Sequence, residues 1–559
     1  MRSVRLFSGL MLLFGVGFVT LVPLGFLVLN SFNTSQLGQE MSWGLDGWRQ
    51  AFGAPQTVSA LMYSFLLSTR TFLGIAVAFL ISWLLIRVRI PAFSFIEFSL
   101  WMAWFLPPLS VTIGWIALLD PQYGLANKLL ASMLPFPARF NIYSFSGIFW
   151  VHLTLLTVPV MTILLTPALR QMDAAFEESA RTCGSGPLRT LMRIVVPLLW
   201  PAIFVVTIAS LIRALEAFEV EQIIGIPAGI YVYGTRIYDL VRWDPPLYSQ
   251  AMALSTVFLL ALFALVILYQ RFTRHHEFAT LRAGGMSFRP ALIGKWRYLA
   301  SALLILWIVV SIYLPLAMVL AGSFMKFFGM FGIENPFTIQ HWTSVLSDPA
   351  FAKALRNSLI LGLGVATLGV AVYALLGYTI QRSSLVGRST LSLLVWIPWA
   401  IPGILLGLSL LWIFLSVRLL NFLYGTMLVL IFSMVLKDMP IGTQMFKAAF
   451  AQITEELEQA SRVAGAGPFT TFRRITIPLV APMMVSIFVL LFMSSIRDIS
   501  TPILLATPAT TPLSVLMLER SVAGEIEKAA VIGVILSVLA IITAVVMRRL
   551  GLRMGAEPV

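Results

Sequence analysis

A few charged side chains of this chain lie inside otherwise apolar stretches, where they could act on a solute. Lys437 and Asp438 are adjacent and come just before Pro440 in such a stretch. Ionisable groups at membrane depth are costly, so they are functional candidates by default. The two residues either line a passage or form an internal ion pair between helices, and the sequence favours neither reading. Arg70, in another apolar stretch, suits a structural or snorkelling role better.

The remaining residue types exclude most other chemistry. A single cysteine, Cys183, rules out an intramolecular disulfide, and four histidines leave little material for a metal or haem site. The dipeptide Gly294-Lys295 lacks the surrounding glycine and hydroxyl residues of a phosphate-binding loop. No paired acidic residues have a spacing that suits catalysis. We therefore expect no enzyme activity, no metal site and no cofactor bound by this chain.

The bulk composition predicts a membrane protein. The chain has 559 residues, of which 59% are hydrophobic and 11% charged, with a mean hydropathy of +0.92. A soluble domain cannot bury that much apolar surface, so lipid must solvate most of it. The net charge of +14 could suggest nucleic acid. However, the basic residues lie in short loops between apolar spans, which is the positive-inside pattern, and we expect no nucleic-acid partner.

Apolar stretches long enough to cross a bilayer recur about twelve times. The first, Leu6–Leu29, is too long for a signal peptide and lacks a small-residue cleavage site, so we interpret it as a transmembrane helix. The stretches in the first half are Leu6–Leu29, Leu61–Ile86, Phe93–Leu119, Ile148–Leu169, Ile194–Ile212 and Ala251–Tyr269. Those in the second half are Leu299–Ala321, Leu359–Ile380, Leu391–Leu415, Leu423–Phe446, Ile475–Ile496 and Ala529–Val546.

The distribution of charge between loops predicts the orientation. With both termini in the cytoplasm, the cytoplasmic segments hold about twice as many Lys and Arg residues as the outer ones. The basic stretch between the halves is then a cytoplasmic linker. The predicted organisation is a first repeat at residues 1–270, a linker at 271–298 and a second repeat at 299–559.

An internal repeat supports this division. Glu177–Pro201 aligns with Glu458–Pro482 without a gap at a shift of 281, and 11 of the 25 positions are identical. Farther upstream the shift becomes 294, which pairs Tyr63-Ser64 with Asn357-Ser358. Each half has an even number of spans, so the halves enter the membrane from the same side and enclose a pathway between them. The predicted class is therefore a transporter.

The best-matched part of the repeat is a cytoplasmic loop, which indicates a docking task shared by both halves. Its charged residues fall on about one helical turn, where they can form i,i+3 or i,i+4 pairs. Two glycines then end the helix and permit close approach of another backbone, and a proline starts the next helix. The docking residues predicted in this way are Glu177, Glu178, Arg181, Gly184, Gly186 and Pro187 in the first copy, and Glu458, Gln459, Arg462, Gly465, Gly467 and Pro468 in the second.

These residues carry a resemblance to a known family. The sequence Glu178-Ser-Ala-Arg-Thr-Cys-Gly184, nine residues, then Ile194-Val-Val-Pro197 resembles the EAA loop of binding-protein-dependent ABC importer permeases. The second copy departs from the pattern by placing Gln459 where an acidic residue is usual, so coupling there could depend on Glu458. Phrases such as Arg497-Asp-Ile-Ser-Thr-Pro502 resemble the fused double permeases of ferric-iron importers, and thiamine and aminoethylphosphonate permeases share much of the pattern.

The resemblance implies the fold, the partners and the energy source. It implies an all-α membrane protein of the type I ABC importer permease kind, with about twelve transmembrane helices in two parallel six-helix repeats. It implies two ATP-binding subunits on the cytoplasmic side, which use the ATP, and an external solute-binding protein. It also implies the inner membrane of a prokaryote, with ferric iron favoured as the solute and thiamine or a phosphonate as alternatives.

A second acidic group predicts a further part of the pathway. Glu216, Glu219 and Glu221 follow the fifth apolar stretch, and the repeat counterpart of this segment contains Arg497 and Asp498. We hypothesise that the two segments face each other and form an outer gate; the alternative is a solvated loop that contacts the external protein. The competing class for the whole chain is an ion-gradient-driven secondary transporter in which Lys437, Asp438 and Arg70 serve ion coupling.

Overall fold

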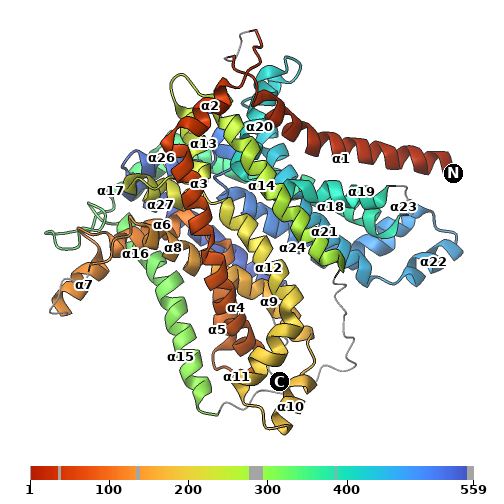
Figure 1. The fold of residues 1–559 in the computed structure, drawn as a ribbon, viewed down its shortest axis with the longest axis horizontal. Helices are drawn as coiled ribbons and strands as arrows, with labels where there is room; N and C mark the ends of the chain where they lie inside the picture. The colour runs from red at the N-terminus through yellow and green to blue at the C-terminus, as the bar shows by residue number, and fades with distance from the viewer. Residues whose placement is uncertain (1, 36–39, 134–138, 276–293, 384–386, 551–559) are drawn as a thin grey trace. The chain divides into compact units, whose positions relative to one another are not determined.

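The computed structural model describes residues 2–35, 40–133, 139–275, 294–383 and 387–550, and their regular elements are all helices (Figure 1). The loops of this part of the chain hold two isolated β-bridges, Asn33 to Trp43 and Met325 to Phe337. The predicted all-α class is confirmed. The predicted linker at 271–298 lies mostly outside the described residues.

Ten helical stretches of the described chain are long and apolar enough to cross a membrane, and twelve if each of two bent helix pairs is one span. This confirms the predicted number. In the first half the straight spans are α1 (Arg2–Asn30), α3–α4 (Pro55–Ser68 and Arg70–Arg87), α8–η1–α9 (Phe145–Gln171), α11–η2–α12 (Pro187–Leu215) and α14 (Tyr248–His275). In the second half they are α15–η5–α16 (Trp296–Ser323), α18 (Pro349–Arg382), α21 (Met427–Gln452), α23–η8–α24 (Pro468–Arg497) and α27 (Ile526–Arg549).

The third span of each half is broken, whereas the sequence predicted continuous stretches there. Helices α5 (Phe93–Phe105) and α6 (Pro108–Leu119) meet at 106°, and the segment Arg388–Trp399 meets α20 (Gly403–Ser416) at 101°. A proline disfavours helical backbone in the residue before it. Leu106, before two prolines, and Ile401, before Pro402, accordingly have extended backbone. The apolar composition that predicted these spans does not indicate where they break.

Prolines also explain the five π-turns in the described residues. Each π-turn ends two residues before a proline: the turns are η1 (Leu153–Thr157), η2 (Leu191–Val195), η3 (Glu221–Gly225), η5 (Val309–Tyr313) and η8 (Phe472–Thr476), and the prolines are Pro159, Pro197, Pro227, Pro315 and Pro478. A proline ring clashes with the carbonyl four residues earlier and removes one hydrogen-bond donor. Widening the turn relieves that clash while the chain continues as a helix.

The chain divides into two compact units that do not follow the sequence halves. Unit 1 comprises Met1–Ala54, Ile237–Leu260 and Leu346–Glu519, and unit 2 comprises Pro55–Arg236, Ala261–Val345 and Arg520–Val559. The first span of each half therefore belongs to the unit built mainly from the other half. In unit 1, α1 packs on α19 (Arg388–Trp396) and α20; in unit 2, α16 (Leu314–Ser323) packs on α6 and α27. The predicted repeat boundaries are a separate matter and stay a prediction.

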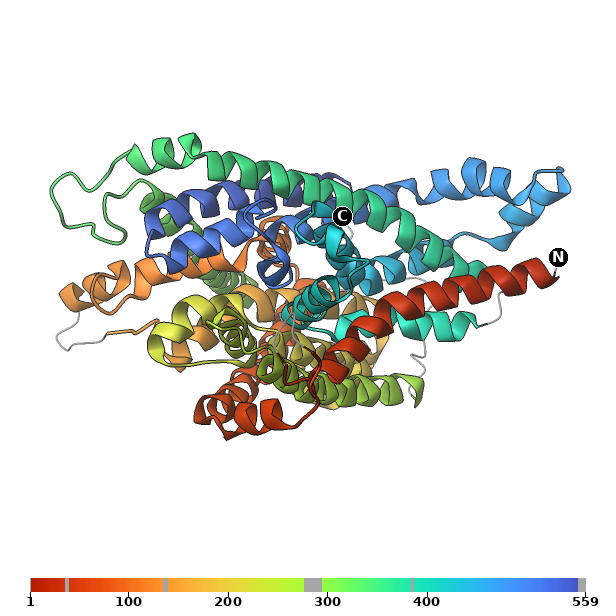
Figure 2. The same cartoon turned by 90° about the horizontal axis from the view of Figure 1, so that it is seen from above.

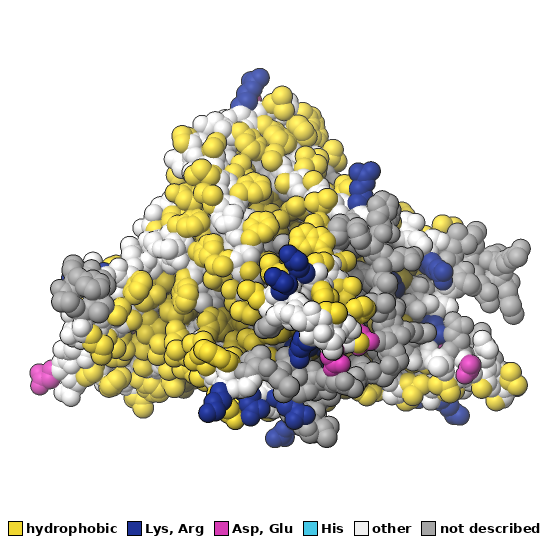
Figure 3. Space-filling view, turned by 60° about the horizontal axis from the view of Figure 1, so that its bottom comes forward, with side chains coloured by type: hydrophobic (Ala, Val, Ile, Leu, Met, Phe, Trp, Pro, Cys, Tyr) yellow, Lys and Arg dark blue, Asp and Glu magenta, His cyan; other side chains and the backbone are white. Residues whose placement is uncertain are grey.

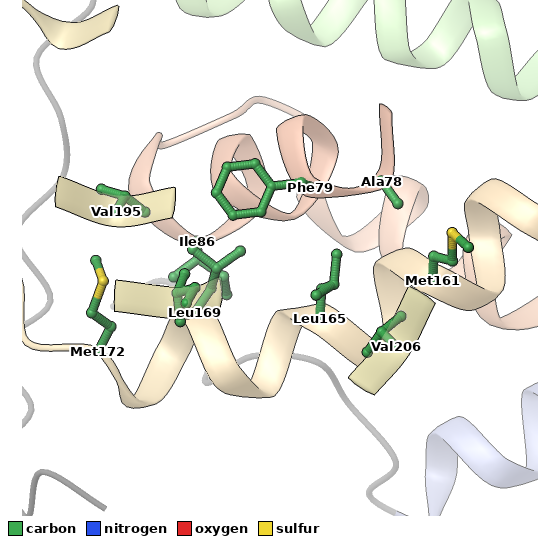
Figure 4. Packing of buried hydrophobic residues seen from close by; sticks show 10 residues of the cluster. Ala78, Phe79, Ile86, Met161, Leu165, Leu169, Met172, Val195 and Val206 are labelled. Atoms are coloured by element: carbon green, nitrogen blue, oxygen red, sulfur yellow. The ribbon is translucent and has the colours of Figure 1, made fainter. Parts of the chain in front are cut away.

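Each unit has a tightly packed helical core. In unit 2, a buried cluster joins α4, α9 (Val158–Gln171) and the η2–α12 span through Phe79, Leu165 and Val195 among others (Figure 4). In unit 1, the long helix α18 packs on α21 and α24 (Ile477–Arg497) (Figure 2). Gly369 and Gly377 of α18 lie against Leu491 and Phe446, so the neighbouring helices can approach the α18 backbone closely.

The outer surface is apolar, as a lipid environment requires. On α1 the side chains of Met11, Phe14 and Phe18 are 68%, 75% and 56% exposed. Figure 3 shows one face of the molecule on which hydrophobic side chains predominate. Large exposed apolar areas of this kind mark a surface that meets lipid or another protein. The chain is therefore a multi-pass membrane protein.

The contact of α6 with α16 gives a test of this packing. A methyl group added at Gly114 would lie 2.1 Å from the backbone oxygen of Pro315, which cannot swing away as a side chain can. We expect Gly114→Ala to lower the free energy of unfolding by about 1–3 kcal/mol, the usual effect of overpacking. The matched control is Gly25→Ala in α1, where no atom lies within 4 Å of the new methyl group. It should be neutral or stabilise by up to about 1 kcal/mol. Thermal unfolding in detergent measures both, and equal midpoints would contradict this view of the contact.

Candidate functional site

The first predicted docking loop is a short helix followed by a glycine turn in unit 2. Helix α10 (Ala175–Thr182) ends at Cys183, and Gly184 has a φ of +78°, a left-handed conformation that glycine adopts without strain. The backbone N–H of Ser185 donates to the carbonyl of Ala180 at 2.9 Å, which closes the turn. Helix α11 (Pro187–Thr190) then leads directly into the π-turn η2 and the next span.

The second loop, in unit 1, has the same construction. Helix α22 (Glu455–Val463) ends before Gly465, whose φ is +83°, and the N–H of Ala466 donates to the carbonyl of Ser461 at 3.0 Å. Helix α23 (Pro468–Thr471) then leads into η8. Two loops that were aligned by sequence alone therefore have matching backbones. The side chains of Pro187, Arg462 and Pro468 lie outside the described part of the structure.

The two loops expose an apolar side chain and bury an acidic one. Phe176 of α10 and Leu457 of α22, which are repeat counterparts, are 42% and 45% exposed. Glu177 and Glu458, also counterparts, are only 4% and 6% exposed. The sequence placed both acids on the docking surface with their neighbours. The structure instead turns these two acids toward the helical bundle, and leaves Gln459 exposed and Glu178 half-buried.

Glu177 is held by an arginine that the sequence analysis did not single out. The Nε of Arg87 donates to the Oε1 of Glu177 at 2.8 Å, and both side chains are 5% exposed. A second guanidinium nitrogen donates to the carbonyl of Met172 at 2.8 Å. Arg87 is the last residue of α4 and Met172 caps α9, so one side chain connects two spans to the docking helix.

In unit 1 an arginine one position beyond the repeat counterpart of Arg87 makes related contacts. Arg382, the last residue of α18, donates to the carbonyl of Phe450 at 2.8 Å and also to the carbonyl of Ile453. Ile453 caps α21 and is the repeat counterpart of Met172. An arginine at the end of the second span thus anchors the chain that enters the docking helix in both units.

Among the predicted pathway residues, Lys437 and Asp498 are brought together in unit 1. Their ammonium and carboxylate groups form an ion pair, and each side chain is 11% exposed. Asp498 also accepts hydrogen bonds from the N–H of Thr501 at 3.0 Å and from the hydroxyl of Ser500 at 3.4 Å. Asp438 is buried and interacts electrostatically with Tyr373 of α18. Lys437 thus forms an ion pair between α21 and the segment after α24, and whether it also lines a passage stays a prediction.

The predicted acidic cluster of unit 2 separates into different environments. Glu216 forms an ion pair with Arg213 at 2.8 Å at the end of α12 (Val196–Leu215), where Arg213 is partly exposed. Glu221 is fully buried, and its Oε1 lies 2.7 Å from the Nε2 of His152 in the fourth span. Because this segment and the one with Arg497 and Asp498 belong to different units, the hypothesis that they form one gate stays a prediction.

The sequence analysis did not single out His152 and did not connect Arg70 with the acidic cluster. His152 precedes the π-turn η1 inside a predicted span, and Arg70 was interpreted as structural. Arg70 is 2% exposed, donates to the carbonyls of Leu67 at 2.8 Å and Ala214 at 3.1 Å, and interacts electrostatically with Glu221. An ionisable residue within a predicted span was the available signal for both.

The comparisons with known proteins cover up to about three quarters of the chain. Residues 373–556 match the family described as binding-protein-dependent transport system inner membrane component. A ferric transport system permease protein of Actinobacillus pleuropneumoniae is 26% identical over 445 residues, which cover 78% of this chain and 62% of that protein. A relative from Haemophilus influenzae, also named for ferric transport, is 27% identical over 72% of this chain and 63% of its own length. These matches thus span less than two thirds of the two relatives.

Other relatives match only about half of this chain and are named for a different solute. A Salmonella paratyphi A protein named for 2-aminoethylphosphonate transport is 23% identical, and the match covers 47% of this chain and 98% of that protein. Among solved structures, a bacterial importer of the polysaccharide alginate is similar with a TM-score of 0.38 and 21% identity, over 45% of this chain and 94% of that one. Residues 373–556 thus carry the inner membrane component domain of binding-protein-dependent transport systems, and the resemblance to that family of ABC importer permeases is confirmed.

Proposed function

We propose that this chain is the membrane permease of an ATP-driven importer. The observation that carries the proposal is the docking loop, built twice with the same backbone, once in each unit, and each time with an exposed apolar side chain. A repeated surface of this kind suits two copies of one cytoplasmic partner. The partner proposed is an ATP-binding subunit under each loop, with an external solute-binding protein on the opposite side.

The proposed mechanism is alternating access driven from these loops. Closure of the two ATP-binding subunits would move both docking helices together, and the spans attached to them would change the side on which the pathway opens. The chain itself would hydrolyse no ATP and bind no cofactor. It would lie in the inner membrane of a prokaryote with both termini in the cytoplasm.

Ferric iron is the solute we propose. The support is that relatives matching 72% and 78% of this chain are named for ferric transport, whereas the phosphonate relative matches only about half of it. A phosphonate or thiamine is the alternative. Because the separate binding protein selects the solute in such systems, the buried charges of this chain do not decide between them.

A secondary transporter driven by an ion gradient is the competing function. The observation in its favour is the pair of buried charged clusters, His152 with Glu221 and Lys437 with Asp498, of a kind that proton relays use. The duplicated docking loop argues against a secondary transporter, because such a transporter has no partner protein that would bind two matching cytoplasmic helices.

The docking proposal predicts what co-purifies with the chain. A tagged chain, extracted gently from its native membrane, should bring an ATP-binding subunit in about twofold excess. The double variant Gly184→Val, Gly465→Val should lose it, because valine strains the left-handed turn by about 1–2 kcal/mol at each site and displaces the docking helix. No other atom lies within 4 Å of a Cβ added at either glycine, so the bundle itself should stay folded.

The matched control for this experiment is Gly524→Val. Gly524 has the same left-handed φ of +83° and equally open surroundings, but it lies in the loop before α27, away from both docking loops. This variant should retain the ATP-binding subunit. A wild-type chain that purifies alone and moves solute with only an ion gradient would refute the importer and favour the secondary transporter.

The Lys437–Asp498 pair gives a test that separates a pathway role from a structural one. Removing one charge, as in Lys437→Met, leaves a buried charge without its partner and should lower the free energy of unfolding by about 3–5 kcal/mol. The double variant Lys437→Met, Asp498→Leu should recover most of that stability. If the pair lines the pathway, uptake of ferric iron into proteoliposomes should stay low in the stable double variant. Recovery of both stability and uptake would assign the pair a purely structural role.

A further inference from the structure

Helix α4, the C-terminal part of the second span, has a buried arginine at each end, and each arginine binds a different segment of unit 2. Helix α4 begins at Arg70 and ends at Arg87, and both residues are at most 4% exposed. Arg87 binds the first docking helix through Glu177, as described above. Arg70 lies at the other end, where it donates to the carbonyl of Ala214 in α12.

Helix α4 is the unbroken element in this part of unit 2. Its 18 residues contain no proline and no π-turn, and at 1.5 Å per residue they span about 27 Å. The two spans packed against it are different: the fourth contains η1, Pro159 and Pro167, and the fifth contains η2, Pro197 and Pro201. A helix can absorb a displacement at a π-turn or a proline, where its hydrogen-bond ladder is interrupted, whereas a regular helix passes the displacement along its axis.

Close packing prevents α4 from moving independently of its neighbours. The cluster shown in Figure 4 packs the C-terminal part of α4 against α9. Nearer the N-terminus of α4, a methyl group placed on Gly74 would lie 2.4 Å from the side chain of Thr157, the last residue of η1. His152 immediately precedes that π-turn. A shift of α4 therefore bears directly on the turn that positions His152.

The N-terminal end of α4 is also fixed by polar contacts. The guanidinium of Arg70 donates to the carbonyl of Ala214, the next-to-last residue of α12, at 3.1 Å. Ala214 precedes Glu221 by seven residues in the chain, and Glu221 and His152 are 0% and 4% exposed. A displaced Arg70 therefore pulls on the segment that leads to the buried pair.

We propose that Arg87 and Arg70 are positioning residues that make α4 a rigid link between the first docking helix and the His152–Glu221 pair. The inference rests on the proposed function, because it assumes that an ATP-binding subunit moves the docking helix. It assigns the link to the first docking loop alone. Arg382 supplies the C-terminal contact in unit 1, but the repeat counterpart of Arg70 is Gly364, which has no side chain to supply the N-terminal one.

The test follows a thiol placed beside the N-terminal end of the link. Ala228→Cys lies in the short helix η4 (Ile226–Ala228), which directly follows the π-turn that contains Glu221. The purified complex with its ATP-binding subunit is treated with a maleimide, with and without ATP and vanadate. Peptide mass spectrometry counts the label on residue 228 separately from the label on Cys183. In an otherwise unchanged chain, nucleotide should alter the labelling rate at residue 228 by threefold or more.

Breaking the C-terminal contact should abolish this nucleotide response without loss of the partner. In Arg87→Gln the ATP-binding subunit should still co-purify, because the exposed face of α10 is unchanged, but labelling at residue 228 should no longer depend on nucleotide. If that chain does not fold, Glu177→Gln serves instead, since it removes the charge and keeps a hydrogen-bonding amide. Arg87→Lys should retain part of the response. The matched control is Arg89→Gln, an exposed arginine two residues farther on, which should leave the response intact.

The possible failures are distinguishable. A nucleotide response that persists in Arg87→Gln, or is absent in the unaltered complex, would overturn the link while leaving the importer in place. Failure of any ATP-binding subunit to co-purify with the wild-type chain would instead remove the proposed function and the link with it. An equal loss of response in Arg382→Gln would overturn the assignment of the link to the first docking loop alone.

Discussion

Hydrocarbon offers no hydrogen bonds, so a chain that crosses it must satisfy its own backbone groups, and this constraint shapes every span of the protein. Helices are the outcome, yet the spans are rich in prolines, which cannot donate. The structure meets that conflict in two ways. Where one proline follows a helical stretch, as at Pro159 or Pro478, the helix widens into a π-turn and continues. Where prolines coincide with a need to change direction, as at Pro107 and Pro108, the span breaks and turns through about a right angle.

The same constraint governs the charges. A cation buried in a bundle of apolar helices must find an anion or several carbonyl oxygens, and each such contact joins segments far apart in sequence. Arg87 with Glu177 and Lys437 with Asp498 follow this pattern, and His152 is likewise joined to the buried acid Glu221 by a polar contact. Each pair joins one span to a segment outside it, so the buried charges mark the joints at which spans and loops are held together. The prolines supply the places where the chain bends, and the charges fix where it is anchored.

Much of this was predictable from the residues. Apolar length gave the spans, and a gapless repeat located both docking loops, because both signals are local in sequence. The inward turn of Glu177 was not predictable, since it depends on Arg87, ninety residues earlier at the end of another helix. Lys437 was singled out as a buried charge, but its partner Asp498 was not predictable, because sequence alone says little about which face of a helix meets which segment. The exchange of first spans between the compact units leaves no trace in hydropathy at all.

Duplication makes the differences between the halves as informative as the likenesses. The features that both halves keep lie at the docking end: the left-handed glycines, the buried acids and the arginines that close the second spans. The charge pairs near the other end are not kept. At the shift of 281, His152 corresponds to Ser433 and Lys437 to Leu156, so each half has a pair that the other lacks. The docking end is therefore the part of the repeat whose construction both halves keep, and the buried pairs are a part in which they differ.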